Sequence, residues 1–318
     1  MLCAMQKSAL LGLVAIAAVG CGGGNSPGGG DDDGTPPIDA PGTMPDSPPI
    51  PDGYTRLIGR TWTLQAGQLD VYRCVRVTIP QDMYITSIMS QAPLGTHHSV
   101  LSIMTDSLPD GESDCSVGTL GMNMLYASGV GTSPLDFPSD VGIKLAAGTH
   151  IHLNLHLYNA SDQALSGDSA ILVKAQPTPP PMLAEMVFAG KLTLSIPYTS
   201  PPTEYIAQGG CTVNSPYKLF AIWPHMHKIA THQRVELTRG GTTTFLHDLP
   251  YQFAEQKYYL QTPEIQLQAN DRITVKCTYL NTTGHTVSQG DSSDNEMCFS
   301  GLYRYPATNA GLFQCTSI

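Results

Sequence analysis

The chain is poor in charge, since only 13% of its 318 residues are Asp, Glu, Lys or Arg. It has 16 basic residues against 26 acidic ones and no basic patch, which excludes the electrostatic pattern of a nucleic-acid-binding protein. Phosphate-binding glycine loops, dinucleotide-binding motifs and the G-x-S-x-G motif of serine hydrolases are also missing. Glycine and proline are plentiful, at 31 and 25 residues, as is typical of exported all-β proteins whose short strands alternate with turns.

A long hydrophobic run is also missing. The apolar stretch Ala9–Val19 is too short to span a membrane and has the layout of a secretory signal peptide over residues 1–20. It ends in Ala-Val-Gly-Cys, which resembles a bacterial lipobox with Cys21 as the lipidated N-terminus; secretion with Cys21 unmodified is the alternative. Residues 21–53, rich in Gly, Pro and Asp, predict a disordered tether. We therefore expect an exported protein in a bacterial periplasm, outer membrane or cell surface, touching the membrane only through this lipid.

The remaining residues, 54–318, suffice for one large or two ordinary domains. Six of the 26 acidic residues and one of the 16 basic residues precede Tyr54, so this part carries 15 minus 20, a net charge of −5. Strand-like runs separated by turn residues predict β-sandwiches. A proline-rich hinge near residues 176–182 predicts two of them, at 54–178 and 183–318. The expected strands are Leu69–Thr78, Tyr84–Met89, Ser99–Met104, Gly142–Leu145, His150–Tyr158, Ile171–Ala175, Glu185–Phe188, Lys191–Ile196, Leu219–Trp223, Gln233–Thr238, Thr243–Leu249, Glu264–Leu267, Arg272–Tyr279 and Glu296–Tyr305.

The chain has no Cys-x-x-Cys pair, which disfavours a cysteine-rich zinc site. Of its eight cysteines, Cys3 falls in the signal peptide and Cys21 is the lipidation site. The other six, in an oxidising compartment, predict three disulfides with 15 connectivities open; free core thiols are the alternative. Two of the six precede residue 120 and four follow residue 210, which suggests one bridge in the N-terminal half and two in the C-terminal half.

Residues 150–156 alternate polar and aliphatic side chains, and a period of two places all the polar groups on one face of a strand. The aliphatic face is expected in a sandwich core, so the polar face meets water, a cleft or a metal; for each histidine a solvated position is the alternative. The polar residues are His150, His152, Asn154 and His156.

Two further histidine pairs have ligand-like spacing. His225 and His227 share one strand face and can reach a single ion, with two surface histidines as the alternative. His97 and His98 are adjacent and point to opposite faces of a regular strand, so one ion binds both only if the backbone bends, which Gly95 permits.

Met297, beside Cys298, adds a candidate thioether ligand, although methionine more often fills gaps in a core. Imidazole suits several metals, whereas a thioether selects Cu(I), so the combination points to copper and to redox chemistry. Histidines without a ligand-spaced partner are expected at the surface, namely His232, His247 and His285. Acidic residues without a pairing that suggests acid–base work are Asp70, Glu236 and Glu255.

Taken in order, these motifs resemble the copper type II, ascorbate-dependent monooxygenases, a family that includes peptidylglycine α-hydroxylating monooxygenase and dopamine β-monooxygenase. The order and spacing of the motifs are more specific than any one of them. They are Val71–Cys74, His97–His98, the strand ending at His156, Pro224–His227 and Glu296–Cys298, within a resemblance running from about Tyr72 to Cys315. The resemblance implies two β-sandwiches facing across an open cleft, with one copper on each and with ascorbate as the reductant.

Ligands and disulfides follow from this resemblance. It implies a first copper held by His97, His98 and His156, and a second held by His225, His227 and Met297. The second copper is the implied O2-binding reaction centre, with His225, His227 and Met297 as catalytic residues, and the first stores and passes an electron. The implied disulfides are Cys74–Cys115, Cys211–Cys315 and Cys277–Cys298. Asn154 and Tyr72 are expected to support the first site from behind its ligands, and solvated positions are expected for His150 and His152.

The substrate does not follow from the resemblance. In the peptide-hydroxylating branch an Arg and an Asn help to clamp the substrate, and this chain has Trp223 and Phe299 at those positions. Neither can clamp a carboxylate. We therefore predict a monooxygenase that hydroxylates an activated C–H bond of a small, non-peptide substrate, using O2 and an electron donor. Trp223, Phe299 and Tyr303 would line its cleft, with ordinary packing as the alternative. A non-catalytic periplasmic copper-binding or electron-transfer lipoprotein, or a scaffold lipoprotein without metals, are the alternative functions.

Overall fold

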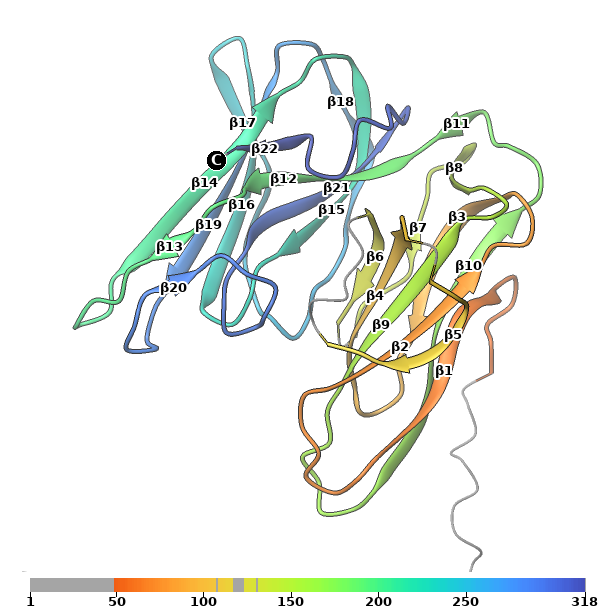
Figure 1. The fold of residues 1–318 in the computed structure, drawn as a ribbon. Coiled ribbons are helices and arrows are strands. Elements are labelled where there is room, and N and C mark those ends of the chain that lie inside the picture. The colour runs from red at the N-terminus through yellow and green to blue at the C-terminus, as the bar shows by residue number, and fades with distance from the viewer. Residues whose placement is uncertain (1–48, 107, 117–122, 130, 318) are drawn as a thin grey trace, which may run out of the picture. The chain divides into compact units, whose positions relative to one another are not determined.

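The computed structural model describes residues 49–106, 108–116, 123–129 and 131–317 (Figure 1). The predicted signal peptide, Cys21 and most of the predicted tether lie outside these residues. In the part that is described, no helix is long and apolar enough to cross a membrane. The described residues form strands joined by turns and loops, so the expected all-β fold is confirmed.

The first half of the chain forms two sheets of antiparallel strands. One has the order β1-β10-β3-β8-β11 with β7 paired to β3, and the other has the order β5-β2-β9-β4-β6. Only the short β11 runs parallel to its neighbour, β8. The strands are β1 Thr55–Leu64, β2 Val71–Thr78, β3 Met83–Gln91, β4 Thr96–Met104, β5 Gly111–Asp114, β6 Asn123–Ser128, β7 Leu135–Asp136, β8 Val141–Leu145, β9 His150–Leu157, β10 Leu165–Gln176 and β11 Met182–Leu183.

The second half forms a five-stranded sheet, β18-β15-β21-β12-β22, a four-stranded sheet, β14-β19-β16-β17, and the short pair β13-β20. Its pairs are antiparallel except β12 with β22. The strands are β12 Glu185–Lys191, β13 Ser195–Ile196, β14 Glu204–Thr212, β15 Tyr217–His225, β16 Ala230–Arg239, β17 Thr242–Pro250, β18 Tyr259–Leu267, β19 Arg272–Leu280, β20 Val287–Ser288, β21 Cys298–Tyr305 and β22 Cys315–Ser317.

Two hydrophobic cores fill these sheets. One lies between the β14-β19-β16-β17 sheet and one face of the five-stranded sheet, and contains Val187, Ile222 and Val275. The other fills the first half and continues onto the opposite face of that five-stranded sheet through Phe188 and Trp223. The central strands of this sheet are therefore buried on both faces, and nearly every residue of β12, β15 and β21 is buried. All the described residues belong to one compact unit, and the expected division into domains at 178 and 183 stays a prediction.

Three disulfides brace the sheets, and they are the three pairs that the resemblance implies: Cys74–Cys115, Cys211–Cys315 and Cys277–Cys298. The second joins β14 to β22 and the third joins β19 to β21. Three disulfides are typical of an exported protein, because reducing compartments keep such thiols free.

The structure corrects several expectations about strands and exposure. A strand was expected over Lys191–Ile196, but β12 ends at Lys191 and only the last two residues form β13. The first strand, β1, and the long β14 were not expected, because their apolar residues follow no regular alternation. The polar face of β9 is not solvated: His152 is 2% exposed, and the amide of Asn154 donates to the carbonyl of Ser116 (3.1 Å). The disulfide Cys74–Cys115 holds this segment against the sheet.

Histidines outside the motifs also differ from expectation. His247 was expected at the surface but is buried on β17, where its ring lies 4.5 Å from that of Tyr259 between centroids. Burial, with a smaller contribution from the charge of His232, lowers the pKa of His247 to about 4. His150 is half-buried, with its Nδ1 3.0 Å from Oγ1 of Thr78.

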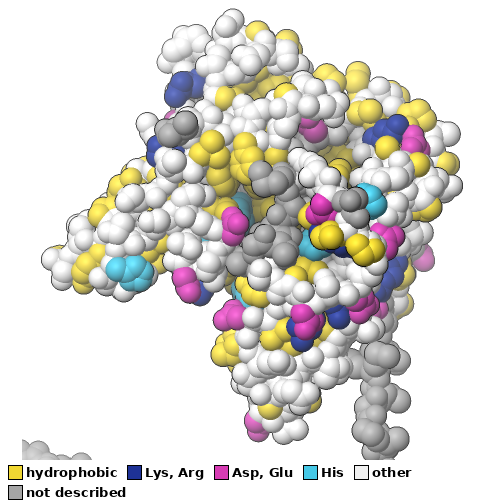
Figure 2. Space-filling view, in the orientation of Figure 1, with side chains coloured by type: hydrophobic (Ala, Val, Ile, Leu, Met, Phe, Trp, Pro, Cys, Tyr) yellow, Lys and Arg dark blue, Asp and Glu magenta, His cyan; other side chains and the backbone are white. Residues whose placement is uncertain are grey.

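The surface carries no sign of a polyanion-binding face in the view shown. Figure 2 shows acidic and basic side chains interspersed, without a continuous basic area on that face.

Candidate metal centres

His97 and His98 project to the same side of β4 because the strand bulges between them. Thr96 pairs with Leu157, but His98 already pairs with His156, so β4 has one residue more than β9 across this interval. Gly95, just before it, has a φ of +99°, a conformation that glycine adopts without strain. The two rings lie 4.2 Å apart between centroids. The bend on which a shared ion depends is therefore present.

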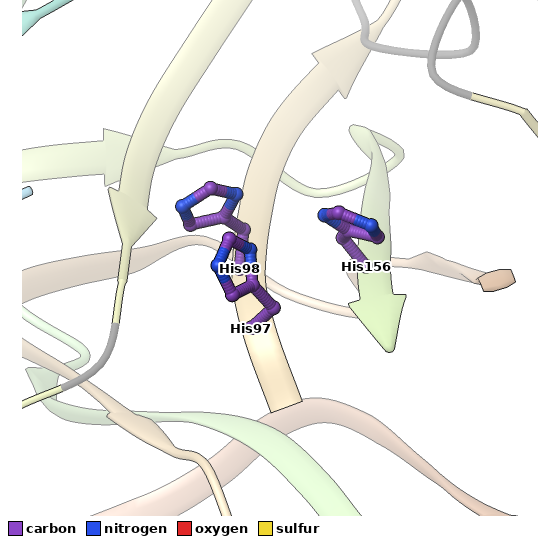
Figure 3. Close-up of side chains that lie close together, drawn as sticks. All are labelled: His97, His98 and His156. Atoms are coloured by element: carbon purple, nitrogen blue, oxygen red, sulfur yellow. The ribbon is translucent and has the colours of Figure 1, made fainter. Parts of the chain in front are cut away.

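His156, at the end of β9, completes a cluster of three imidazoles with this pair (Figure 3). One nitrogen from each ring can be chosen so that all three lie within 4.8 Å of one another. Tyr72 on β2 is the cross-strand partner of His156, and the two rings stack at 4.6 Å. Tyr72 thus fixes the orientation of the His156 ring, as expected for a supporting contact.

The hydrogen bonds of this cluster leave one ring nitrogen of His156 and one of His97 available for a metal. His156 donates its Nε2–H to a carboxylate oxygen of Asp70 (2.9 Å), so its Nδ1 is the free lone pair. Nδ1 of His97 is buried without a hydrogen-bond partner. A carboxylate that orients a histidine from behind is a common support of metal sites. Asp70, expected to have no such pairing, therefore supports the cluster; its position two residues before the cross-strand partner of His156 was the only signal.

A second cluster lies where β15 ends and β21 begins. His225 is the last residue of β15, His227 follows two residues later, and the two rings are 5.4 Å apart. His227 donates its Nδ1–H to the carbonyl of Asn295 (3.0 Å), which leaves its Nε2 free. Nδ1 of His225 is buried without a partner. Met297 lines the same cavity as these rings.

Glu296, a buried carboxylate that sequence reasoning missed, joins the two segments of this second cluster. It accepts backbone N–H groups from His227 (2.8 Å), Ile229 (2.9 Å) and Met297 (3.3 Å). Burial raises the pKa of Glu296 to about 7, although these N–H groups act in the opposite direction. Its place directly before Met297 in the Glu-Met-Cys motif was the available signal.

Burial is the largest effect on the pKa of each of the five candidate histidine ligands, and it lowers that pKa below 6.5. All five side chains are therefore neutral near pH 7. The pKa of His225 falls to about 3, and that of His98 lies well below 6.5. The pKa values of the other three, His97, His156 and His227, are also lowered. Neutral imidazole is the form that binds metals, so no proton has to be displaced for ligation.

The loop 251–258, between β17 and β18, forms a wall shared by both clusters. Phe253 packs against the rings of His98 (5.0 Å) and His227 (5.8 Å). The side-chain amide of Gln256 donates to Nε2 of His98 (3.1 Å), and the backbone carbonyl of Gln256 accepts from Nε1 of Trp223 (3.2 Å). Sequence reasoning missed these residues because neither type is a metal ligand and neither lies in a motif.

The two clusters line one cavity of about 70 Å³. The open cleft that the resemblance implies is here a small cavity, and Phe253 and Gln256 of the loop 251–258 form part of its wall. A dry cavity of about 150 Å³ accommodates benzene, so an aromatic substrate requires this loop or its side chains to move. Residues around the cavity include Tyr72, His98, Asn154, His156, Trp223, His225, His227, Phe253, Gln256 and Met297.

Of the three aromatic residues expected to line the cleft, only Trp223 does so, with its indole stacked on His225 at 4.8 Å. Phe299 packs against Phe188 at 5.1 Å between ring centroids. Tyr303 is fully buried and donates its hydroxyl to the carbonyl of Leu125 (2.8 Å). The structure thus places Phe299 and Tyr303 in packing contacts, away from the cavity.

The donor sets suit copper. One set has three imidazoles, and the other has two imidazoles and a thioether. Copper accepts both sets in both of its oxidation states, and the thioether favours Cu(I). The buried, unpartnered Nδ1 atoms of His97 and His225 fit this assignment, since a buried polar atom without a partner is otherwise costly.

Comparison with known proteins finds similarity over the second half of the chain and to two curated relatives. Residues 185–317 match the family described as copper type II ascorbate-dependent monooxygenase, C-terminal domain. The chain is 27% identical over 232 residues to DBH-like monooxygenase protein 1 of Mus musculus, covering 67% of this chain and 36% of that protein. The protein of the same name from Gallus gallus is 24% identical over the same length and coverage. The chain thus spans about a third of the length of these relatives.

Among solved structures, a Paenibacillus xanthan lyase is similar over 84% of this chain and 28% of its own, with 13% identity and a TM-score of 0.21. The infectious bursal disease virus Gx strain structure gives 9% identity and a TM-score of 0.19, over 86% of this chain and 77% of its own. Scores this low carry no argument about fold or function. The matched C-terminal domain and these relatives support the resemblance to the copper type II ascorbate-dependent monooxygenases that the ordered motifs indicate.

Proposed function

We propose that the protein is a copper-dependent monooxygenase that uses O2 and a one-electron reductant, with ascorbate as the family's donor, to hydroxylate an activated C–H bond of a small non-peptide substrate. The observation that carries this proposal is that two clusters with different donor sets line a single cavity. Different donor sets suit different tasks, because the softer set favours the reduced ion. The proposed ligands are His97, His98 and His156 for one copper, and His225, His227 and Met297 for the other.

The bound copper ions would supply one-electron redox chemistry and activation of O2. The protein's own part is to orient and to exclude water. Asp70 and the carbonyl of Asn295 orient His156 and His227 through the ring nitrogens that face away from the cavity. Glu296 keeps the segments of His227 and Met297 together. Apolar contacts from Trp223 and Phe253 restrict water at the reacting position.

A small, apolar or aromatic substrate is supported by the walls of the cavity. Trp223 stands beside His225, and no arginine lines the cavity among the described residues, so a carboxylate would find no bidentate partner. The side chain of Asn154 also lines this cavity. Peptides ending in glycine are therefore not the proposed substrates.

The proposal extends to location. An oxidising compartment is required for the disulfides, and a signal peptide over residues 1–20 with lipidation at Cys21 would deliver the chain there. Residues 21–53 would then act as the tether. Mass spectrometry of the mature N-terminus tests this part, since an unmodified Cys21 would exclude the lipid anchor.

The alternative, a copper protein that stores or transfers electrons without catalysis, needs neither a cavity nor a second type of ligand set. One experiment separates the two functions. The copper-loaded protein is supplied with ascorbate and a panel of small aromatic and aliphatic C–H substrates, and O2 uptake is recorded beside the copper content. Substrate-stimulated uptake with about two copper ions per chain supports the enzyme. Copper binding without substrate-stimulated uptake supports the alternative, and the absence of copper excludes both.

The variant Met297→Ile serves as the control. It conserves volume at a partly buried position while removing the thioether, so the fold should persist. Substrate-stimulated uptake should be lost in this variant with the disulfides and strand content unchanged. Full turnover by Met297→Ile would contradict the assignment of the reaction to that cluster.

A further inference from the structure

Three exposed apolar side chains lie at the end of the β2-β9-β4 sheet, beside the three-histidine cluster. Leu69, Leu94 and Tyr158 are 48%, 83% and 42% exposed, and we call them the Leu94 patch. Single exposed apolar residues are ordinary, but neighbouring ones that border a functional site indicate an interaction surface. Leu94 is the most exposed of the three, so its side chain contributes least to the stability of the fold.

The backbone brings these three residues together from distant parts of the chain. The N–H of Tyr158 donates to the carbonyl of Gly95 (2.8 Å), which places Leu94 beside the end of β9. On the other side, the N–H of Asn159 donates to the carbonyl of Gln68 (2.9 Å) and brings Leu69 to the same edge. The patch therefore spans three adjacent strand ends.

His97 connects this patch to the metal cluster. Its ring is half-buried and lies 6.5 Å from the ring of Tyr158, while only 4.2 Å separates it from that of His98. An electron arriving from a docked molecule would thus reach the three-histidine cluster through one side chain.

The charges around the patch indicate which donor fits. Asp70, next to Leu69, has a 70% exposed side chain, and Asp162 is exposed in the turn after Tyr158. Asp294, also exposed, forms an ion pair with Lys228 (2.8 Å), so that pair contributes no net charge. The surroundings are therefore negative, which repels an anion such as ascorbate and attracts a basic protein.

We propose that the Leu94 patch docks a small one-electron redox protein that has an apolar centre and a basic rim, and that this protein reduces the three-histidine cluster. This inference rests on the proposed monooxygenase function. Its electron balance is R–H + O2 + 2 e⁻ + 2 H⁺ → R–OH + H2O, with the two electrons supplied by two donor molecules that are each oxidised by one electron. Transient electron-transfer contacts are small, and three apolar side chains with an acidic surround match that class.

The first test measures docking without copper. Mitochondrial cytochrome c, a small basic haem protein with an exposed apolar haem edge, is the probe, and its affinity for the metal-free full chain is measured at low and high salt. Leu94→Lys places a charge within the patch, whereas Leu260→Lys adds the same charge at a similarly exposed residue of β18 (49%). We expect binding to weaken about tenfold in Leu94→Lys and to weaken with salt, and to stay within about twofold in Leu260→Lys.

Equal affinities of the two variants would overturn the docking surface and leave the monooxygenase function standing. The docking surface would also be overturned if the wild-type chain did not bind the probe. This holds as well if the chain's own N-terminal segment occupied the patch and prevented binding. Both variants replace exposed leucines, so the fold should be retained, and matching melting temperatures confirm that the comparison concerns the surface.

The second test uses the copper-loaded protein and compares two donors by rapid mixing. Reduced cytochrome c is followed through its haem absorbance, and ascorbate through its own absorbance. Leu94→Lys should slow reduction by cytochrome c about tenfold and leave reduction by ascorbate unchanged, because a small anion does not need the patch. Equal slowing of both donors would overturn the role of the patch in docking a protein. A wild-type chain that binds the probe but retains no copper would overturn the electron-transfer role and the proposed function together.

Discussion

Replacing Glu296 by Gln should weaken copper binding at the second cluster while leaving the protein folded. The carboxylate is fully buried and accepts three backbone N–H groups, two of which belong to the proposed ligands His227 and Met297. Gln has the same shape but only one acceptor oxygen. Its NH2 group must therefore face at least one backbone N–H, and the segments on either side will separate to relieve that contact.

The magnitudes of the two opposing effects can be compared. A buried N–H left without a partner costs about 1–3 kcal/mol. In the other direction, burial raises the pKa of Glu296 from 4.5 to about 7, so the ionised form costs the folded protein up to about 3 kcal/mol above pH 7, a cost that neutral Gln avoids. At pH 8 the free energy of unfolding should therefore change by no more than about 1–2 kcal/mol. Loss of a group that orients metal ligands typically lowers metal affinity about 10- to 100-fold.

The assay is a competition titration of Cu(I) between the protein and a chelator, together with urea unfolding of the metal-free chain at pH 8. Glu296→Gln should show one copper bound as in the wild type and one bound about 10- to 100-fold more weakly. Glu255→Gln is the matched control, because Glu255 is partly exposed and pairs only with Lys257 across the surface. It should change neither affinity.

Unchanged affinities for both copper ions in Glu296→Gln would refute the reasoning, since the contact would then position nothing that copper uses. Weakening of both sites to the same extent would also count against it, because Glu296 touches only the segments of the second cluster.

Three further predictions follow. Asp70→Asn should lower copper affinity about 10- to 100-fold at the three-histidine cluster alone, measured in the same titration, because the carboxylate that orients His156 is lost; an effect confined to the other cluster would contradict it. Glycine-extended peptides should not be hydroxylated by the copper-loaded protein, as judged by mass spectrometry, because Trp223 cannot bind their carboxylate; robust turnover would exclude this substrate assignment. The pKa of His247 is about 4 in the folded protein, against 6.5 when it is unfolded, so between these pH values the unfolded chain binds more protons. The contribution of His247 to the free energy of unfolding is therefore fully present above pH 6.5, and up to about 3 kcal/mol of it is lost as the pH falls toward 4. In urea unfolding, His247→Gln should lack this part of the decrease in stability toward acid pH.

The ligand-bearing strands were predictable because their patterns are local. The alternation over residues 150–156 and the His-x-His spacing at 225–227 follow from the period of a strand. Burial was less predictable: the polar face of β9 is covered by a segment held through Cys74–Cys115, and whether a face meets water depends on what another part of the chain places over it. The exposure of His247 was misjudged for the same reason.

Supporting residues were the part that no pattern indicated. Asp70 meets His156 across 86 residues, Glu296 meets His227 across 69, and Gln256 meets His98 across 158. A carboxylate or an amide is common on any surface, so its role emerges only when the partner is brought to it.

From residue identity and spacing alone, the chain determined its fold class, the six cysteines of its disulfides and the imidazole and thioether groups of its two candidate ligand sets, because side-chain chemistry and strand periodicity are properties of neighbouring residues. Tertiary structure decided the rest: the bulge that turns His97 and His98 to one side, the groups that orient His156 and His227, and the loop 251–258 that forms part of the cavity wall. These depend on contacts between segments far apart in sequence, whose register is set only when the sheets pack.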